Sequence, residues 1–307
     1  MKRSLQAVLL ILSGAIGGIF LLMQFSFDEN KEPVVRKNKT NNENEMVWHA
    51  PTVPTQMNFA GENVPLDRWD VYERLDRELL YNYYYQNNII YIMKLANRYF
   101  PVIEERLKAN GVPDDFKYLC IAESNLQNLT SRAGAVGFWQ FMPKSAPEYN
   151  LSVNSLVDER YDYVKSTDAA CKYLKQAYAK FGSWTAAAAS YNCGQGGYNG
   201  QAKFQGTKNY YDLLLPEETN KYIFRILAFK HLLSNAEELG FTIDDEKLYA
   251  PHKTREVIVT STISNLATWA QSQGTTYKIV KLLNPWLRGR SLPVKSGVQY
   301  KILLPAS

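Results

Sequence analysis

Glu123 and Ser124 end an apolar segment, DDFKYLCIAES, and precede the polar stretch NLQNLTSRAG. A glutamate at the point where a buried helix meets a loop is partly withdrawn from water, which raises its pKa and keeps it protonated near neutral pH. A carboxyl in that state can act as a general acid. A glutamate at a helix end is more often simply solvated, so Glu123 alone does not establish an enzyme.

Glycines and large side chains follow Glu123 at close range, in AGAVGFWQFMP. Gly134 and Gly137 let the backbone approach a ligand closely, while the bulky side chains pack around it. Gln140 and Met142 lie at the end of this stretch and are candidates for ligand contact. Core packing explains the same pattern if it is considered alone.

Polar and aromatic groups recur near the ends of two later helices. Tyr191 and Asn192, in SYNCG, follow an alanine-rich segment, and Glu218 and Tyr222, in ETNKYI, share one helix face at i and i+4. Each also has a structural alternative. The tyrosines fit as core aromatics, Asn192 with Gly194 as a helix C-cap, and Glu218 as a favourable charge in a first helical turn.

The elements that must position these residues are predicted to be helices. Apolar residues recur with a helical period from about residue 66 to 240, without a convincing run of alternating strand residues. Pro101 suits the first turn of a helix that ends at Gly111, and further helices are expected at about 158–182 and 217–239. The predicted fold class of this region is therefore mainly α.

After Pro251 the pattern changes to a strand, two short helices and a second strand, in REVIVTSTIS, SNLATWAQSQG, TYKIVKLLNP and VQYKILLP. This β-α-α-β module has about fifty residues, which is small for an independent enzyme. We therefore expect an accessory binding unit.

The amino-terminal segment at residues 5–27 contains no charged residue and follows Lys2 and Arg3. It is long enough to span a bilayer, which needs roughly 20 apolar residues, and the preceding positive charges place its start in the cytoplasm. A cleaved signal peptide is the alternative. The expected organisation is a transmembrane anchor at 1–27, a flexible linker at 28–60, a helical domain at 61–250 and the module at 255–307.

Charge and cysteine content argue against several other functions. The formal charge is +5, from 35 Lys and Arg against 30 Asp and Glu, and the basic residues are dispersed, so no nucleic-acid partner is expected. The three cysteines and three histidines lack metal-ligand or triad spacing, so no metal or cofactor is expected either. Cys171 has the position of a small core residue, and a bridge between Cys171 and Cys193 is left open.

The order of the motifs resembles a known family. The segments ES, GAVGFWQFMP, DERYD, STDAACKYL, SYNCGQG and ETNKYI follow one another as in the lysozyme-like (goose-type, SLT) domain of lytic transglycosylases, closest to the membrane-bound lytic murein transglycosylase D group. The resemblance covers roughly residues 65–240. It departs from the family at Ser190, where alanine is usual, and at Phe138, where leucine is usual.

The resemblance implies a helical lysozyme-like fold that acts on peptidoglycan glycan strands, and it assigns roles to individual residues. Glu123 corresponds to the catalytic acid and base of the family. The residues that correspond to its substrate cleft are Ser124, Gln140, Met142, Tyr191, Asn192 and Tyr222.

The segment after residue 255 is similar to LysM domains, which share the β-α-α-β order, an Asn-Pro near the second helix and a final hydrophobic strand with proline. It departs from them at Thr260, Ser261 and Thr262, where Gly-Asp-Thr is usual. The resemblance implies a degenerate peptidoglycan-binding module. A fold retained only for packing or protein contact is the alternative.

The resemblance, taken with the apolar amino-terminal segment, implies a membrane-anchored, extracytoplasmic enzyme that cleaves the bond between N-acetylmuramic acid and N-acetylglucosamine and leaves 1,6-anhydro ends. Most glycoside hydrolases use two carboxylates, whereas Glu123 is the one good candidate here, because DERYD is interpreted as a helix start with ion pairing around Arg160. A goose-type hydrolase and a non-catalytic peptidoglycan-binding scaffold are the alternatives.

The tyrosine-rich YNYYYQNN, at 81–88, fits either sugar stacking or an amphipathic helix. The sequence does not identify a protein partner.

Overall fold

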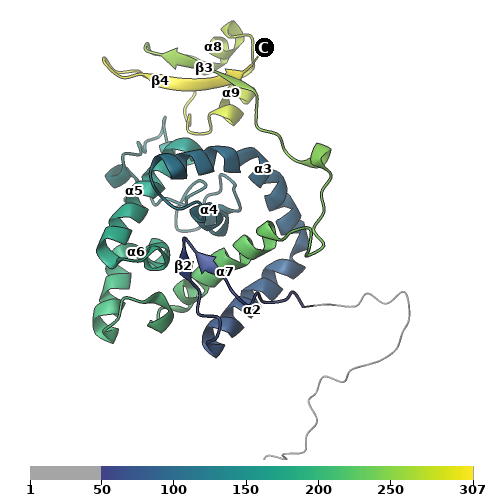
Figure 1. Ribbon diagram of the computed structural model, residues 1–307. Coiled ribbons are helices and arrows are strands. Elements are labelled where there is room, and N and C mark those ends of the chain that lie inside the picture. The colour runs from purple at the N-terminus through teal and green to yellow at the C-terminus, as the bar shows by residue number, and fades with distance from the viewer. Residues whose placement is uncertain (1–49, 307) are drawn as a thin grey trace, which may run out of the picture. The chain divides into compact units, whose positions relative to one another are not determined.

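The computed structural model describes residues 50–306, and in it a set of helices surrounds the short helix α4 (Figure 1). The helices of this domain are α2 (Trp69–Tyr84), α3 (Gln86–Ala109), α4 (Phe116–Ser124), α5 (Tyr163–Phe181), α6 (Trp184–Gln205) and α7 (Glu217–Ser234). Short 3-10 turns are η1 (Ala146–Tyr149), η2 (Glu159–Tyr161), η3 (Tyr210–Asp212) and η4 (Asp245–Lys247). The mainly α prediction is therefore confirmed for this part of the chain.

The predicted membrane anchor, at 5–27, lies outside the described residues, as does most of the predicted linker. None of the helices between residues 50 and 306 combines the length and the apolar character that a membrane span requires.

Helix α4 is short and largely enclosed. Six of its nine residues are buried. Phe116, at its start, packs edge-on against the rings of Phe59 and Trp184, at centroid distances of 5.3 and 5.4 Å. The helix is stopped by Asn125, which has a left-handed backbone with φ of 52°. The last turn, which carries Glu123, is therefore where α4 leaves the core.

Two helix starts differ from the sequence prediction. Pro101 lies inside α3 and not in its first turn, because burial of an apolar face along the whole helix outweighs the loss of one N–H donor. Helix α5 begins at Tyr163 and not at 158. Asp158 caps the preceding turn η2, while Asp162 caps α5 itself, and the predicted stop at Gly182 is confirmed.

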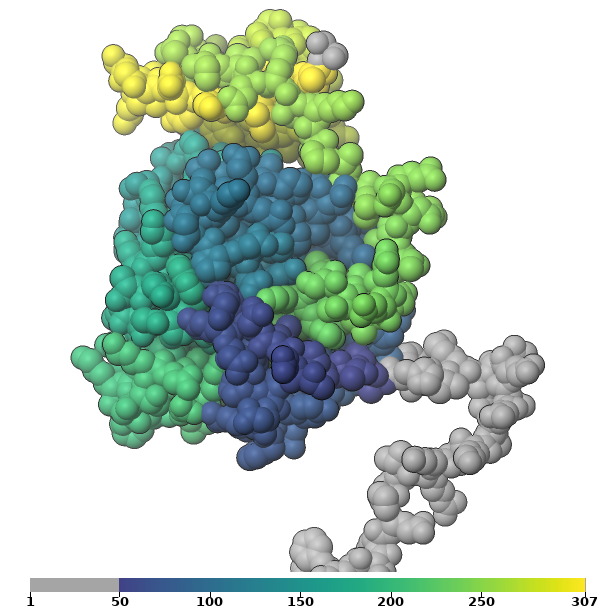
Figure 2. Space-filling view, viewed as in Figure 1, coloured from purple at the N-terminus to yellow at the C-terminus, as the bar shows by residue number. Residues whose placement is uncertain are grey.

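A small hairpin precedes the helices and packs on them. Its strands are β1 (Asn58–Phe59) and β2 (Glu62–Asn63), and Figure 2 shows the first described residues, in purple, spread over the bundle. Val53 and Phe59 are buried in the core, so the expected linker and the packed domain overlap at residues 50–60. Glu62 accepts hydrogen bonds from the backbone N–H groups of Trp184 at 2.6 Å and Thr185 at 2.9 Å.

The C-terminal module has a core of its own. Strand β3 (Thr254–Val259) pairs antiparallel with β4 (Tyr300–Pro305), α9 (Tyr277–Leu283) packs on β4, and α8 (Leu266–Ser272) packs on α9. Asn284 is fully buried and exchanges two hydrogen bonds with the backbone of Leu303, at 2.7 and 2.8 Å. The predicted β-α-α-β order is confirmed, and the Asn-Pro of the sequence joins α9 to the final strand.

We expect Glu62→Ala to destabilise the domain by about 1–2 kcal/mol, because two buried backbone donors at the start of α6 lose their acceptor. Glu62→Gln, which keeps one acceptor oxygen, should cost less. The measurement is the free energy of unfolding in urea. Glu73→Ala, at an exposed position of α2, is the control, and equal stability of the two alanine variants would show that the cap contributes nothing.

Candidate active site

Glu123 is half-buried in the last turn of α4. The hydroxyl of Tyr222, from α7, donates a hydrogen bond to its Oε1 atom. Burial raises the pKa of Glu123 to about 7, while the hydrogen bond from Tyr222 and the charge of Arg225 lower it in part. At neutral pH a large fraction of this carboxyl therefore holds its proton, as a general acid requires.

Two further carboxylates are held by Arg225. Its Nη1 donates to Oε1 of Glu218 at 3.0 Å, and its Nε lies 3.7 Å from Oε2 of Glu78. Glu78 is 7% exposed, and burial raises its pKa. The positive charge of Arg225 acts against this effect of burial, because it favours the ionised form of Glu78. Glu123 is therefore the candidate for proton transfer at this site.

Ser124 follows Glu123 in sequence and faces the interior. It is 3% exposed, and its hydroxyl donates to the carbonyl of Phe138 at 2.9 Å. This bond joins the end of α4 to residues 128–142, called the cleft loop from here on. The hydroxyl of Ser124 thus fixes the cleft loop beside Glu123, and the side chain lines neither of the two hollows described below.

The cleft loop depends on close backbone approach. Gly137 has φ of +84°, and a Cβ atom at this position would lie 2.0 Å from the carbonyl oxygen of Arg160, so a side chain does not fit. Gln140 also has a positive φ, 47°, which is uncommon for a residue with a side chain and is concentrated at functional sites. Its Nε2 donates to the carbonyl of Gly137 at 2.8 Å.

Tyr191 and Asn192 connect α6 to its neighbours. The hydroxyl of Tyr191 donates to the carbonyl of Trp139 at 2.8 Å, and Oδ1 of Asn192 accepts from the hydroxyl of Thr219 at 2.8 Å. Helix α6 is interrupted two residues later at Gly194, which has φ of 75° and ψ of 148°. The pair therefore lies at the end of the first of two helices that α6 joins across a kink at Gly194.

Gln140, Met142 and Tyr191 come together in a hollow of about 400 Å³. Its other lining residues are Phe141, Ser145, Glu148, Tyr149, Tyr173, Gln176 and Gln195. Amide and hydroxyl groups among flat or flexible apolar side chains form a lining that suits a sugar, which has both polar edges and apolar faces. Three of the predicted substrate-binding residues thus line the same hollow. We call it the first hollow.

Sequence patterns miss Tyr173 and Gln176, which line the first hollow from α5. The hydroxyl of Tyr173 donates to the carbonyl of Ser190 at 2.5 Å, and its ring meets that of Tyr191 edge-on, with centroids 5.0 Å apart. The sequence feature that could have identified them is their i, i+3 spacing, which places two polar groups together beside an apolar helix face. Ser190, one of the two departures from the family pattern, is fully buried.

A second hollow, of about 870 Å³, opens beside the end of α4. Ala122 and Asn125 line it from that end, and Arg225 lines it from α7. The end of α2 adds Tyr81 and Tyr85, whose side chains are 74% and 62% exposed. The remaining lining residues are Asp76, Arg77, Glu78, Leu80, Asn82, Tyr84, Asn88, Lys221 and Phe229.

No group of three His, Cys, Asp or Glu side chains between residues 50 and 306 is arranged to hold a metal ion. The cysteines are free, so the bridge that the sequence left open between Cys171 and Cys193 is not formed. Cys171 is buried, as predicted.

Comparison with known families agrees with this geometry. Residues 100–214 match the transglycosylase SLT domain, and residues 255–307 match the C-terminal LysM-like domain of soluble lytic transglycosylases. The chain thus contains an SLT transglycosylase domain followed by a LysM-like domain. The SLT match ends before α7, so Tyr222 and Arg225 lie outside the matched range.

The chain is homologous to membrane-bound lytic murein transglycosylase D of Escherichia coli (strain K12). The two are 29% identical over 220 residues, which are 68% of this chain and 47% of the relative. The protein of the same name from Escherichia coli O6:H1 gives the same values. A putative tributyltin chloride resistance protein of Alteromonas sp. (strain M-1) is 27% identical over 103 residues, 33% of this chain and 50% of that protein. The chain spans about half the length of the curated relatives it matches.

We expect Tyr222→Phe to raise the pKa of Glu123 from its value of about 7, because it removes the hydrogen bond that favours the ionised carboxylate. The measurement is a carbon-13 NMR titration of the glutamate side-chain carboxyls, in which Glu123 is identified by its loss in Glu123→Gln. Tyr198→Phe removes another tyrosine hydroxyl bond, to the carbonyl of Lys208, and is the control. A lowered pKa in Tyr222→Phe would contradict this account of the site.

Proposed function

We propose that this chain is a lytic transglycosylase that cleaves the β-1,4 bond between N-acetylmuramic acid and N-acetylglucosamine in peptidoglycan. The observation that carries the proposal is the half-buried carboxyl of Glu123, with its pKa raised to about 7 and its Oε1 bonded by Tyr222. The SLT-domain match and the homology to lytic murein transglycosylase D support the same activity.

In the first step Glu123 is the acid. Its proton passes to the glycosidic oxygen, the bond between that oxygen and C1 of the muramic acid breaks, and the N-acetylglucosamine end leaves with a new hydroxyl. Positive charge develops at C1. Because Arg225 holds Glu78 and Glu218, the protein offers neither as a nucleophile, and the N-acetyl group of the substrate stabilises this carbon instead.

In the second step the ionised Glu123 is the base. It takes the proton of the C6 hydroxyl of the muramic acid, and the C6 oxygen bonds to C1 to close a 1,6-anhydro ring. The carboxyl is protonated again, and no water is consumed. The hydrogen bond from Tyr222 stabilises the ionised carboxylate between the two steps. Gln140 and Tyr191, in the first hollow, hold the muramic acid so that this attack within one molecule is faster than hydrolysis.

The proposal extends the glycan strand through both hollows, with the cleaved bond at Glu123. The first hollow offers glutamine and tyrosine side chains, and the second offers the exposed rings of Tyr81 and Tyr85 with Asn88 and Asn125. Aromatic rings bind the apolar faces of sugars, while amide groups bind their hydroxyls. A polymer bound on both sides of the cleaved bond gains affinity from groups remote from the chemistry.

The proposal also includes an extracytoplasmic location. The uncharged segment at 5–27 supplies a membrane anchor, and the two positive charges before it orient the chain outward. The LysM-like domain supplies attachment to the wall polymer. The curated relative is described as membrane-bound, which agrees with this arrangement.

We expect Glu123→Gln to lower kcat/KM on purified peptidoglycan by at least about 10²-fold, because an amide has the shape of the carboxyl but cannot transfer its proton. Glu218→Gln, at a carboxylate that Arg225 holds at the surface, is the matched comparison and should retain far more activity. In the wild-type protein, kcat/KM should be level below about pH 7 and fall above it, because the acid form of Glu123 is lost as pH rises through its pKa of about 7.

The product distinguishes the proposal from simple hydrolysis. Mass spectrometry of the released muropeptides should show 1,6-anhydro ends, which are lighter than hydrolysed ends by one water. Released reducing ends would identify a hydrolase. Full activity of Glu123→Gln would show that another group is the acid.

We expect the double variant Tyr81→Ala/Tyr85→Ala to lose activity on long glycan strands while keeping it on the shortest fragments that are cleaved, because short fragments do not reach the end of α2. A loss of about 3- to 30-fold corresponds to one or two sugar-aromatic contacts. Trp69→Ala removes an exposed aromatic from the same helix outside the second hollow and is the control. Equal loss of activity on long and short substrates would show that these tyrosines do not contact the glycan strand.

A further inference from the structure

Residues 156–161, called the bridging segment here, contact the C-terminal module on one side and the cleft loop on the other. The segment contains most of the DERYD motif, which the proposed mechanism does not use. It includes the turn η2 and immediately precedes α5. The bridging segment therefore lies where a shift of the C-terminal module could move the cleft loop.

On the module side, the bridging segment forms backbone hydrogen bonds with residues 286–289. The N–H of Asp158 donates to the carbonyl of Trp286 at 2.9 Å. The N–H groups of Arg288 and Gly289 donate to the carbonyl of Leu156 at 2.8 and 3.1 Å. This pattern is a short antiparallel pairing, and it fixes the register of the two segments as a β-ladder does.

Side chains reinforce this pairing. Val157 is 3% exposed and is part of the hydrophobic core of the module, although it belongs to the chain before α5. The guanidinium of Arg288 lies 4.1 Å from the ring centre of Tyr161, a cation-π contact. Gly289 approaches so closely that a Cβ atom would lie 2.5 Å from Cδ2 and 3.4 Å from Cα of Leu156. These are features of a packed domain interface.

On the other side, the bridging segment holds the cleft loop through Arg160. This side chain is 7% exposed and pairs with Asp158 through two bonds, of 2.9 Å from Nε and 2.7 Å from Nη2. Its Nη1 donates to the carbonyls of Gly134 at 3.0 Å and Phe141 at 3.1 Å. One buried cation thus clamps both ends of the turn that presents Gln140 to the first hollow.

Tyr161 adds two contacts to the same loop. Its carbonyl accepts from Nδ2 of Asn128 at 3.1 Å, and its hydroxyl is bonded to that of Thr130 at 3.0 Å. The ring that carries this hydroxyl is the ring over which Arg288 of the module lies. The backbone of Arg160 also fills the space that the missing side chain of Gly137 leaves. The cleft loop therefore rests on the bridging segment along most of its length.

We propose that the C-terminal module is a positioning element of the active site: through the bridging segment it holds the cleft loop, and with it Gln140 and Met142, in the shape that binds substrate. This inference rests on the proposed transglycosylase function. It differs from a tether, which raises the local concentration of the enzyme on its polymer and leaves its action on small soluble substrates unchanged. The physical basis is a continuous series of buried hydrogen bonds from Trp286 to Phe141.

The test uses the full chain with Gly289→Leu, whose Cβ atom would lie 2.5 Å from Cδ2 of the Leu156 side chain, so that Leu156 has to move away from the module. We expect kcat/KM on short soluble peptidoglycan fragments to fall about 3- to 10-fold, mainly through KM, because the cleft loop binds substrate and does not supply the proton. Arg288→Ala, which removes the ring contact without adding bulk, should act in the same direction. Gly289→Leu combined with Leu156→Ala makes room for the new side chain and should recover much of the loss.

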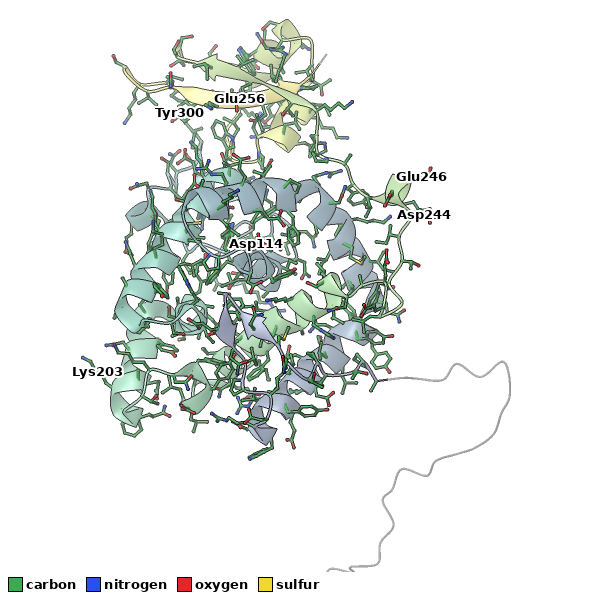
Figure 3. All side chains as sticks on the ribbon, in the orientation of Figure 1. Asp114, Lys203, Asp244, Glu246, Glu256 and Tyr300 are labelled. Atoms are coloured by element: carbon green, nitrogen blue, oxygen red, sulfur yellow. The ribbon has the colours of Figure 1, made fainter. Side chains whose placement is uncertain are left out.

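Hydrogen exchange supplies a measurement that does not depend on activity. The amides of Val136, Gly137 and Phe141 are hydrogen-bonded within the cleft loop. They should exchange faster in Gly289→Leu than in the wild-type chain, because the clamp on the loop is loosened. The control is Lys301→Ala, which breaks an exposed ion pair with Glu256 and should change neither measurement. Glu256 is labelled on the β3-β4 ribbon in Figure 3.

The outcomes separate the two proposals. If Gly289→Leu behaves like Lys301→Ala in both measurements, the module is not a positioning element. A loss of activity without faster exchange in the cleft loop would also overturn the inference, because the module would then act on the substrate directly. If the wild-type chain cleaves no form of peptidoglycan, the proposed function fails, whereas the exchange comparison still decides whether the module holds the loop.

Discussion

Withdrawal of the Glu123 carboxyl from water is the constraint on which the catalytic domain depends. A fully solvated glutamate is ionised at neutral pH, and a fully enclosed one cannot reach a polymer. Helix α4 meets both demands, because most of its residues are buried while Asn125 stops it just past Glu123. Tyr222 supplies the hydrogen bond that an ionised carboxylate in such a place requires. The helices around α4 can be understood as the enclosure that keeps this one turn at the boundary between core and solvent.

The cleft loop has an irregular backbone that must be held in one shape. It has little regular secondary structure, so its carbonyls need partners from elsewhere. Arg160 provides them from a buried position, and Asp158 neutralises its charge. Buried ion pairs add little net stability, but they penalise alternative arrangements that leave a charge unpaired. The loop is thus specified by one charge cluster and by the close approach at Gly137.

The sequence allowed the helical fold and Glu123 to be predicted, because helical periodicity and a carboxyl at a helix end are local patterns. It could not show that Ser124 points inward, because this depends on how α4 is rotated in the core. It also placed a helix start at Pro101, where burial of a long apolar face overrides a local preference. Arg225 was missed because its partner Glu78 comes from a distant part of the chain. Local signals therefore predicted the residue that we propose as the acid, and tertiary contacts determined which side chains surround it.

The contacts of the C-terminal module indicate a role besides the binding of wall polymer that its resemblance implies. At the position of the usual Gly-Asp-Thr, Thr262 accepts a hydrogen bond from the N–H of Val294 at 3.0 Å, so this turn serves the internal structure of the module. Attachment to a polymer requires only a linker between two domains. A linker does not explain why Val157 completes the hydrophobic core of the module, or why Gly289 lies so close to Leu156 that a Cβ atom would be 2.5 Å from its Cδ2. These contacts require the module and the bridging segment to fit closely together. Such a fit is useful only if the position of the module relative to that segment matters. The partner on the catalytic side is the segment that clamps the cleft loop, so the position that matters is that of the substrate cleft.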